Sequence, residues 1–223
     1  MQRFDTPAPV SAVLDIPAGR MRFIAADRTD TTVEILPADP AKSRDVKAAE
    51  QTEVAYGDGV LRVEVPAAAS RILGASGSVE VTVRLPAGSR VEAKAAAGEF
   101  RGVGRLGDVV FEGQQATVRL DESESTRLTL LAGDIAVGRL GGPAEISTRK
   151  GDIRVTEAVR GTVALHTEHG EISVGAARGV SASLDAGTAY GRIRNALRNT
   201  DGATAALDIH ATTAYGDITA RSL

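Results

Sequence analysis

One short phrase recurs through the second half of the chain and constrains its fold more than any other feature. It reads Thr-x-x-Gly-(acid or Arg)-Ile, and it ends at Ile153, Ile172, Ile193 and Ile218. A weaker copy, Gly133-Asp134-Ile135, precedes them, so that successive glycines are separated by 18, 19, 21 and 25 residues. Self-similarity at this length is typical of stacked repeats, in which each copy buries its apolar face against its neighbours.

Each copy is expected to contain two short strands joined by glycine-rich corners. Apolar residues alternate with polar or small ones on both sides of each glycine, and a period of two is the signal of a half-buried strand. Stacking in sequence order predicts one inward column: Ile135, Ile153, Ile172, Ile193 and Ile218. The longer spacings late in the chain predict protruding loops at Gly187 and at residues 199–204.

The first part of the chain is expected to form antiparallel strands. Met21, Phe23 and Ala25 alternate with polar residues, and residues 78–85 alternate in the same way. Asp58-Gly59 between two alternating runs predicts a tight hairpin. Residues 66–76 are expected to form a loop, and residues 41–51 are assigned to a strand that runs into the hairpin, in preference to a helix. The polar residues 121–126 predict a turn or corner.

The fold class that follows is all-β. We predict a β-solenoid-like stack of two-strand repeats of about 18–25 residues, preceded by an antiparallel β section. The predicted boundary places an N-terminal section at residues 1–89 and the repeat section at residues 90–223. The two sections are either separate domains or one continuous stack.

Composition excludes several classes of protein. The chain of 223 residues has no cysteine, which excludes disulfides, thiolate metal sites and a cysteine nucleophile. A net charge of −3 with only 3% aromatic residues argues against a nucleic-acid binder. The first seven residues show no apolar signal segment, and no stretch approaches the length of a membrane helix. We therefore expect a cytoplasmic protein that does not interact with membranes.

An acidic column follows the glycines of the repeats. It consists of Asp134, Asp152, Glu171 and Asp217, and Arg192 interrupts it. A ladder of carboxylates could bind calcium, but the dense Gly-Gly-x-Gly-x-Asp pattern of calcium-binding β-rolls is absent. The interpretation we favour is structural, because a short acceptor after a turn can bond free backbone amides.

Three further sets of residues invite functional interpretations. His166 and His169, with Glu168 between them, could hold zinc, but residues three apart on a strand point to opposite faces. A threonine column could form an ice-binding face, but the copies differ in length; its members are Thr148, Thr167, Thr188 and Thr213. Tyr190 and Tyr215 could form a carbohydrate platform, although a packed cap is the interpretation we favour. The sequence therefore predicts no metal site.

No catalytic motif is complete. The segment Gly102-Val103-Gly104-Arg105-Leu106-Gly107 matches Gly-x-Gly-x-x-Gly, but no helix is expected after it, so it fails the test for a dinucleotide site. We predict no catalytic residues, no cofactor and no enzymatic activity.

The repeated Gly-Asp-Ile phrases, the segment of residues 86–92 (Pro-Ala-Gly-Ser-Arg-Val-Glu) and the closing Thr-Ala-Tyr-Gly-Asp-Ile of residues 213–218 carry a family resemblance. From about Ala12 to the last residue, the chain resembles the bacterial "putative adhesin" β-strand-repeat family, a domain of unknown function. The resemblance implies a β-solenoid-like fold and carries over no catalytic site.

The function predicted is that of a non-enzymatic, adhesin-like interaction scaffold that binds a protein partner along a face or at an end of the stack. Open ends expose unpaired strand edges, so end-to-end homo-oligomers are also expected. The alternative is a polysaccharide-binding or polysaccharide-cleaving β-helix protein, which would gather acids and bases in a groove. Its candidates are Asp134, Asp152, Glu171, Arg154 and Arg192. A third hypothesis is a surface adhesin exported by an unrecognised route.

Overall fold

The computed structural model describes residues 1–66, 77–200 and 204–223. About 70% of the chain is strand and 5% is helix, which confirms the all-β class. By its internal contacts the chain divides into two compact units, residues 1–116 and residues 117–223. The boundary predicted between residues 89 and 90 falls inside the first unit, where strand β8 begins.

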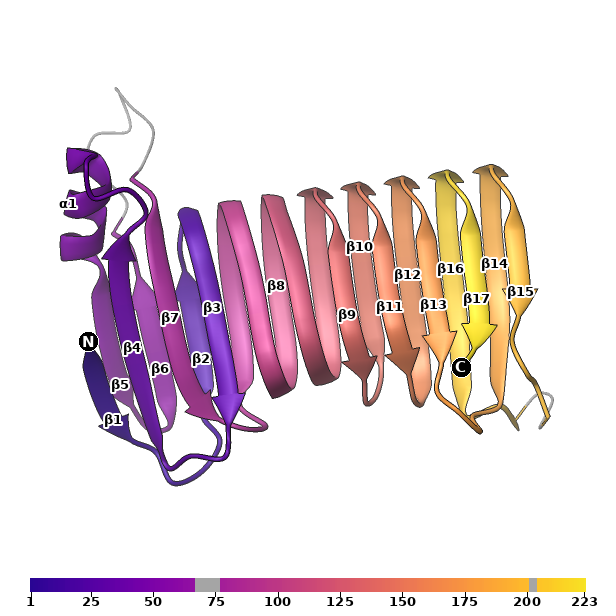
Figure 1. Ribbon diagram of the computed structural model, residues 1–223, viewed down its shortest axis with the longest axis horizontal. Helices are drawn as coiled ribbons and strands as arrows, with labels where there is room; N and C mark the ends of the chain where they lie inside the picture. The colour runs from indigo at the N-terminus through magenta and orange to yellow at the C-terminus, as the bar shows by residue number, and fades with distance from the viewer. Residues whose placement is uncertain (67–76, 201–203) are drawn as a thin grey trace. The chain divides into compact units, whose positions relative to one another are not determined.

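The described residues of the first unit form eight strands and one helix (Figure 1). The last of these strands, β8, continues into the second unit. They are β1 (Gln2–Asp5), β2 (Ser11–Asp15), β3 (Ala18–Ala26), β4 (Asp30–Pro37), α1 (Ser43–Gln51), β5 (Glu53–Gly57), β6 (Val60–Glu64), β7 (Val79–Pro86) and β8 (Arg90–Ala132).

The antiparallel pairing expected for residues 1–89 holds only in part, because parallel and antiparallel pairs are combined in the first unit. β2 pairs in parallel with both β6 and β8, and β3 pairs in parallel with both β7 and β8. The antiparallel strands are β4, which pairs with β1 and β7, and β5, which pairs with β6. The predicted hairpin is confirmed, because Asp58 and Gly59 adopt φ values of 51° and 75° between β5 and β6.

Aromatic side chains form the centre of the first unit's core. Phe23, Phe100 and Phe111 are fully buried, and their ring centroids lie 5.2 and 4.8 Å apart in succession. Met21 and Ala25 are buried on the same side of β3 as Phe23, which confirms the predicted alternation.

The assignment of residues 41–51 to a strand is wrong, because Ser43–Gln51 forms helix α1. The helix packs against β4 and β7. Its buried residues are Asp45 and Ala48, and the Asp45 carboxylate accepts the backbone N–H of Ser78 at 3.0 Å. This helix is therefore stabilised by a tertiary hydrogen bond and by the burial of few side chains. Neither feature produces a strong helical pattern in the sequence. The loop predicted at residues 66–76 lies, beyond Pro66, outside the described residues.

In the second unit, residues 117–200 and 204–223 form the rest of β8 and nine further strands. They are β9 (Ile135–Leu140), β10 (Ala144–Lys150), β11 (Ile153–Ala158), β12 (Gly161–His169), β13 (Ile172–Ala176), β14 (Ala182–Tyr190), β15 (Ile193–Ala196), β16 (Leu207–Tyr215) and β17 (Ile218–Ser222). The predicted corner at residues 121–126 coincides with the point where β8 changes its partner from β9 to β10.

Two parallel ladders organise these strands. One runs β8, β10, β12, β16 and β14, and the other runs β8, β9, β11, β13, β17 and β15. The predicted repeat positions face one another, as shown by the register pairs Ile135 with Ile153 and Ile153 with Ile172. The winding of these ladders into a solenoid stays an interpretation.

The order of the last two copies differs from the prediction. Ile172 pairs with Ile218, and Ile218 pairs with Ile193, so the last copy in sequence lies between the two copies that precede it. Figure 1 shows β16 and β17, in yellow, between β12–β13 and β14–β15. The physical reason is burial: Ile218 is 0% exposed between two neighbours, whereas Ile193 is 44% exposed.

The composition of the two copies explains this order. β16–β17 places Leu207, Ile209 and Ala211 in the core, all fully buried. β15 instead carries Arg194 and Asn195 and is exposed along its whole length. The more apolar copy therefore occupies the position with neighbours on both sides. The prediction of a loop at Gly187 is also wrong, because Gly187 lies within β14. Of the loop predicted at residues 199–204, residues 201–203 lie outside the described residues.

The recurring glycines are required by the close approach of neighbouring copies. A Cβ atom on Gly151 would lie 2.1 Å from the carbonyl oxygen of Gly133, and one on Gly170 would lie 2.0 Å from that of Gly151. Both residues also adopt φ values, 145° and 158°, that side chains with a β-carbon rarely adopt. Glycine therefore permits the stacking distance of the ladder.

Candidate functional site

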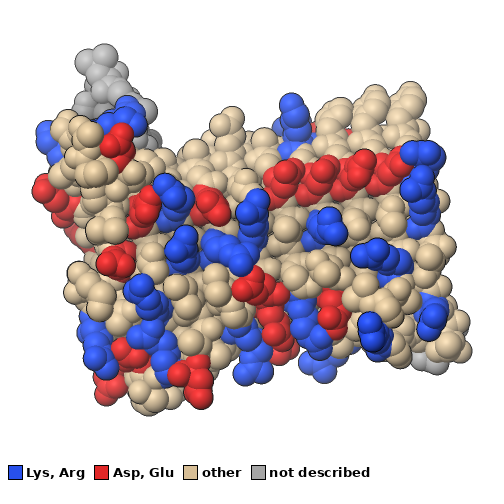
Figure 2. All heavy atoms as spheres, in the orientation of Figure 1, with Lys and Arg blue, Asp and Glu red and all other residues tan. Residues whose placement is uncertain are grey.

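The acidic column is a structural ladder. The Asp134 carboxylate accepts the backbone N–H of Asp152 at 2.9 Å, and the Asp152 carboxylate accepts the N–H of Glu171 at 2.8 Å. Figure 2 shows the acids as a continuous red row that ends at blue side chains. The carboxylates of Asp134, Asp152 and Asp217 each accept an amide of the neighbouring copy, which supports the interpretation favoured from the sequence.

Arg192 ends this ladder at the outermost copy. Its backbone N–H donates to Oδ1 of Asp217 at 2.9 Å, and its Nε and Nη2 atoms donate to Oδ2 at 3.2 and 3.0 Å. These bonds, first the amide and then the guanidinium, hold the pKa of the Asp217 carboxyl below its usual value. An arginine at this position offers no acceptor to the amide of a further identical copy.

The threonine column is internal, which contradicts an ice-binding face. Thr148, Thr167 and Thr213 are almost completely buried. The hydroxyl of Thr167 donates to the carbonyl of Gly151 at 3.1 Å, and the other members make the same bond to the glycine of a neighbouring copy. The column therefore links copies and presents no regular outer surface.

The two histidines of the zinc hypothesis make separate contacts. The Nδ1 atom of His166 lies 2.8 Å from the hydroxyl of Thr212, while the ring of His169 stacks on Tyr215. Across residues 1–66, 77–200 and 204–223, no group of three or more His, Asp or Glu residues is arranged to hold a metal ion. Arg154 is exposed on β11, where its register partners are Ala136 and Ser173, and so it lies outside the row of acids.

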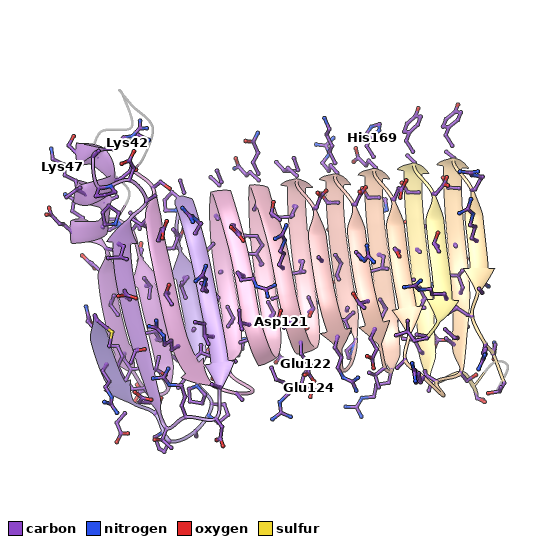
Figure 3. The ribbon with its side chains drawn as sticks, in the orientation of Figure 1. Lys42, Lys47, Asp121, Glu122, Glu124 and His169 are labelled. Atoms are coloured by element: carbon purple, nitrogen blue, oxygen red, sulfur yellow. The ribbon has the colours of Figure 1, made fainter. Side chains whose placement is uncertain are left out.

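A column of stacked rings lies at the ends of three strands. His169, Tyr215 and Tyr190 occupy matching register positions on β12, β16 and β14, and Figure 3 shows the His169 side chain projecting at the end of its strand. Adjacent ring centroids are 4.9 Å apart, with interplanar angles of 6° and 5°. Both faces of the Tyr215 ring are therefore covered by neighbouring rings. Tyr190 lies on β14 and stacks on Tyr215 with one face of its ring.

The outermost copy, β14–β15, forms the edge of the second unit. In the described part of the chain, β14 pairs only with β16 and β15 only with β17. Ile193 is 44% exposed and Tyr190 is 67% exposed, while Leu184 is half-buried. We call this surface the β14–β15 edge and take it as the candidate site, because Ile193 and Leu184 occupy positions that are buried in the neighbouring copy, where Ile218 and Ile209 are 0% exposed.

The β14–β15 edge also differs in charge from its neighbours. Residues 182–200 contain three arginines and one aspartate, a net charge of +2. Residues 207–223 contain one arginine and two aspartates, a net charge of −1, and residues 161–177 contain two glutamates and no Lys or Arg, a net charge of −2. The edge is therefore basic on a chain whose total charge is −3.

The repeat pattern of the sequence does not reveal this edge, because stacking in sequence order places the last copy outermost. The available signal was the concentration of arginine at Arg192, Arg194 and Arg198, in a copy that otherwise keeps the repeat phrase. No helix in the described residues is long and apolar enough to cross a membrane.

Comparison with known proteins gives a likeness of fold. No family model matches the chain, and no curated protein matches it. A solved structure of a "putative adhesin" from Bacteroides fragilis is 13% identical, with 98% of this chain and 95% of the other covered and a TM-score of 0.57. At this identity the likeness concerns the fold alone, and it agrees with the family resemblance seen in the sequence.

Two further solved structures are similar over nearly their whole length. One is a "putative adhesin" from Parabacteroides merdae, 11% identical, with 98% of this chain and 94% of the other covered and a TM-score of 0.47. The other is a "putative cell adhesion protein" from Clostridium sporogenes, 12% identical, with 100% and 98% covered and a TM-score of 0.43.

Proposed function

We propose that this protein is a non-enzymatic, adhesin-like scaffold whose β14–β15 edge binds an extended segment of a partner protein as an added strand. The observation that carries the proposal is the contrast between Ile193 and Ile218. The two residues occupy the same repeat position in register, yet one is 44% exposed and the other 0% exposed. The edge copy keeps the repeat phrase of the inner copies, and among the described residues it pairs with a neighbour on one side only.

The chemistry of strand addition fits this edge. An exposed strand offers a row of backbone N–H and C=O groups, and a partner strand that bonds to them gains affinity from the main chain and specificity from its side chains. Covering Ile193 and Leu184 would add apolar burial to those hydrogen bonds. The fold neighbour from Bacteroides fragilis is named as an adhesin, which agrees with a role in binding.

The ring column supports a protein partner over a polysaccharide. Sugars stack on the faces of aromatic rings, but both faces of Tyr215 are covered by His169 and Tyr190, so the column offers a sugar only the outer face of Tyr190. The acids of the polysaccharide hypothesis are engaged with backbone amides, as shown by Asp134 and Asp152.

The proposal can be tested with peptides selected from a random display library on the full chain. We expect a bound peptide to slow hydrogen exchange within residues 182–196, and we expect Ile193→Lys to abolish binding because it places a charge in the apolar contact. Leu131→Lys is the matched control, since Leu131 is 49% exposed on β8. Slowed exchange confined to another region, or unchanged binding by Ile193→Lys, would refute the proposal.

The compartment we propose is the cytoplasm, as expected from the sequence. Strand addition at the β14–β15 edge does not depend on this assignment. Cell fractionation tests it: recovery in the cytosolic fraction is expected, and recovery at the cell surface would favour the exported adhesin.

A further inference from the structure

The partner's chemistry can be inferred from two features of the β14–β15 edge, on the premise that the edge binds an added strand as proposed above. One feature is the ring column, which ends at Tyr190. The other is the positive charge of the edge copy. Each restricts a different property of the partner.

The ring column is incomplete at its outer end. Tyr215 has a ring on each side, His169 and Tyr190, each 4.9 Å away by ring centroids. Tyr190 is stacked on one side by Tyr215, and it is 67% exposed on the outermost strand. A ring on an added strand in the matching register position would continue the column at the same spacing.

The charge of the edge excludes a basic partner. Arg192 is held by Asp217 through two side-chain hydrogen bonds, and Arg194 is exposed two residues later on β15. The edge copy as a whole carries a net charge of +2. Carboxylates on the added strand would lie beside these arginines, and opposite charges on neighbouring strands stabilise the pair.

The same charge argues against the identical β14–β15 edge of a second copy as the occupant. A second copy would present the same three arginines, and pairing β15 against β15 would place like charges together. The occupant must therefore differ from this edge in charge.

We infer that the β14–β15 edge binds an acidic extended segment of a different protein, with an aromatic side chain that stacks on the outer face of Tyr190. The aromatic residue sets the register of the added strand, and the acidic residues set its preference for this edge. The aromatic residue and the acidic residues both belong to the partner strand, so its binding requires no change in the pairing of the inner strands.

The experiment uses the full chain and the peptide display selection described above, with peptide composition as the readout. We expect the selected peptides to be enriched in Asp or Glu and to share one aromatic residue. Tyr190→Ala should weaken the binding of a selected peptide about three- to tenfold. Replacing the peptide's aromatic residue by alanine should weaken binding to the wild-type chain to the same extent. The same replacement should not weaken binding to the Tyr190→Ala chain any further.

Charge reversal supplies an independent test. Selection on Arg194→Glu should yield peptides that are no longer acidic, whereas selection on Arg154→Glu, an exposed arginine of an inner copy, should yield the same acidic peptides as the wild type. Slowed exchange at residues 182–196 by peptides that are neither acidic nor aromatic would overturn this inference and leave the proposed function standing. Slowed exchange elsewhere would overturn the proposed function itself. A dimer detected by light scattering and dispersed by Ile193→Lys would also overturn the inference, because a second copy would then be the occupant.

Discussion

The backbone amide of Asp152 donates a hydrogen bond of 2.9 Å to Oδ1 of Asp134, which lies 18 residues earlier in the chain. The bond recurs between Glu171 and Asp152 and between Arg192 and Asp217. It links neighbouring copies outside the strands themselves, at the corner that each glycine forms. The acidic residues thus contribute to stability through the amides that they satisfy.

Removal of one such acceptor should destabilise the second unit. We expect Asp152→Ala to lower the free energy of unfolding by about 1–2 kcal/mol, because the amide of Glu171 loses its acceptor. Asp152→Asn keeps an acceptor oxygen and should recover most of the loss. Chemical denaturation measures the free energy of unfolding of both variants. Asp185→Ala is the control, because the Asp185 side chain is 86% exposed. Equal losses for the alanine and asparagine variants would contradict the role of the acceptor.

The glycine of the repeat should tolerate no side chain. A Cβ atom on Gly151 would lie 2.1 Å from the carbonyl oxygen of Gly133, so the copies would have to separate. We expect Gly151→Ala to cost at least about 3 kcal/mol of stability in thermal or chemical denaturation. Gly57→Ala, which meets no atom within 4 Å, should stay within about 0.5 kcal/mol of the wild type. A mild effect at Gly151 would show that the stacking distance is not fixed by this contact.

The order of the last two copies can be measured by comparing two isoleucines. Ile218→Ala should cost about 2–4 kcal/mol, because Ile218 is fully buried between Ile172 and Ile193. Ile193→Ala should cost less than about 1 kcal/mol, because Ile193 is 44% exposed. Denaturation of the two variants gives the comparison. The reverse ranking would support stacking in sequence order.

The ion pair at the end of the acidic column should give a pH dependence of known sign. The Arg192 amide and then its guanidinium lower the pKa of the Asp217 carboxyl, so its contribution to stability is present above the unfolded-state pKa of about 3.9 and is lost as the pH falls through the folded-state pKa. We expect Arg192→Gln to be less stable than the wild type at neutral pH, and the difference to shrink below about pH 4.

Titration followed by NMR tests the same pair directly. In Arg192→Gln, the pKa of the Asp217 carboxyl should rise towards its usual value, because the guanidinium bonds are lost while the backbone amide remains. Arg154→Gln should leave that titration unchanged. An Asp217 titration that is the same in the wild type and in Arg192→Gln would show that the guanidinium does not act on this carboxyl.

The repeat phrase was sufficient to predict the all-β class and the column that joins Ile135, Ile153 and Ile172. It could not predict which copy is outermost, because every copy carries the same phrase and the choice depends on how much apolar surface each buries. The concentration of arginine in residues 192–198, together with the smaller apolar content of that copy, was the available signal.

Helix α1 escaped prediction for a different reason. Its nine residues bury only Asp45 and Ala48, and no side chain caps its first turn. A helix this short is marginal without tertiary packing, and here the bond from Ser78 to Asp45 comes from a residue 33 positions later. Such a contact becomes visible only in the folded chain.

The last copy in sequence lies between two earlier copies, and this affects the order in which the second unit can fold during synthesis. β14–β15 is synthesised before β16–β17, yet the position beside β12–β13 belongs to the later segment. The second unit therefore cannot close progressively behind the ribosome, and it reaches its final arrangement only when residues 207–223 have emerged. A polypeptide that stops short of residue 207 would lack the copy that lies beside β12–β13 in the complete second unit.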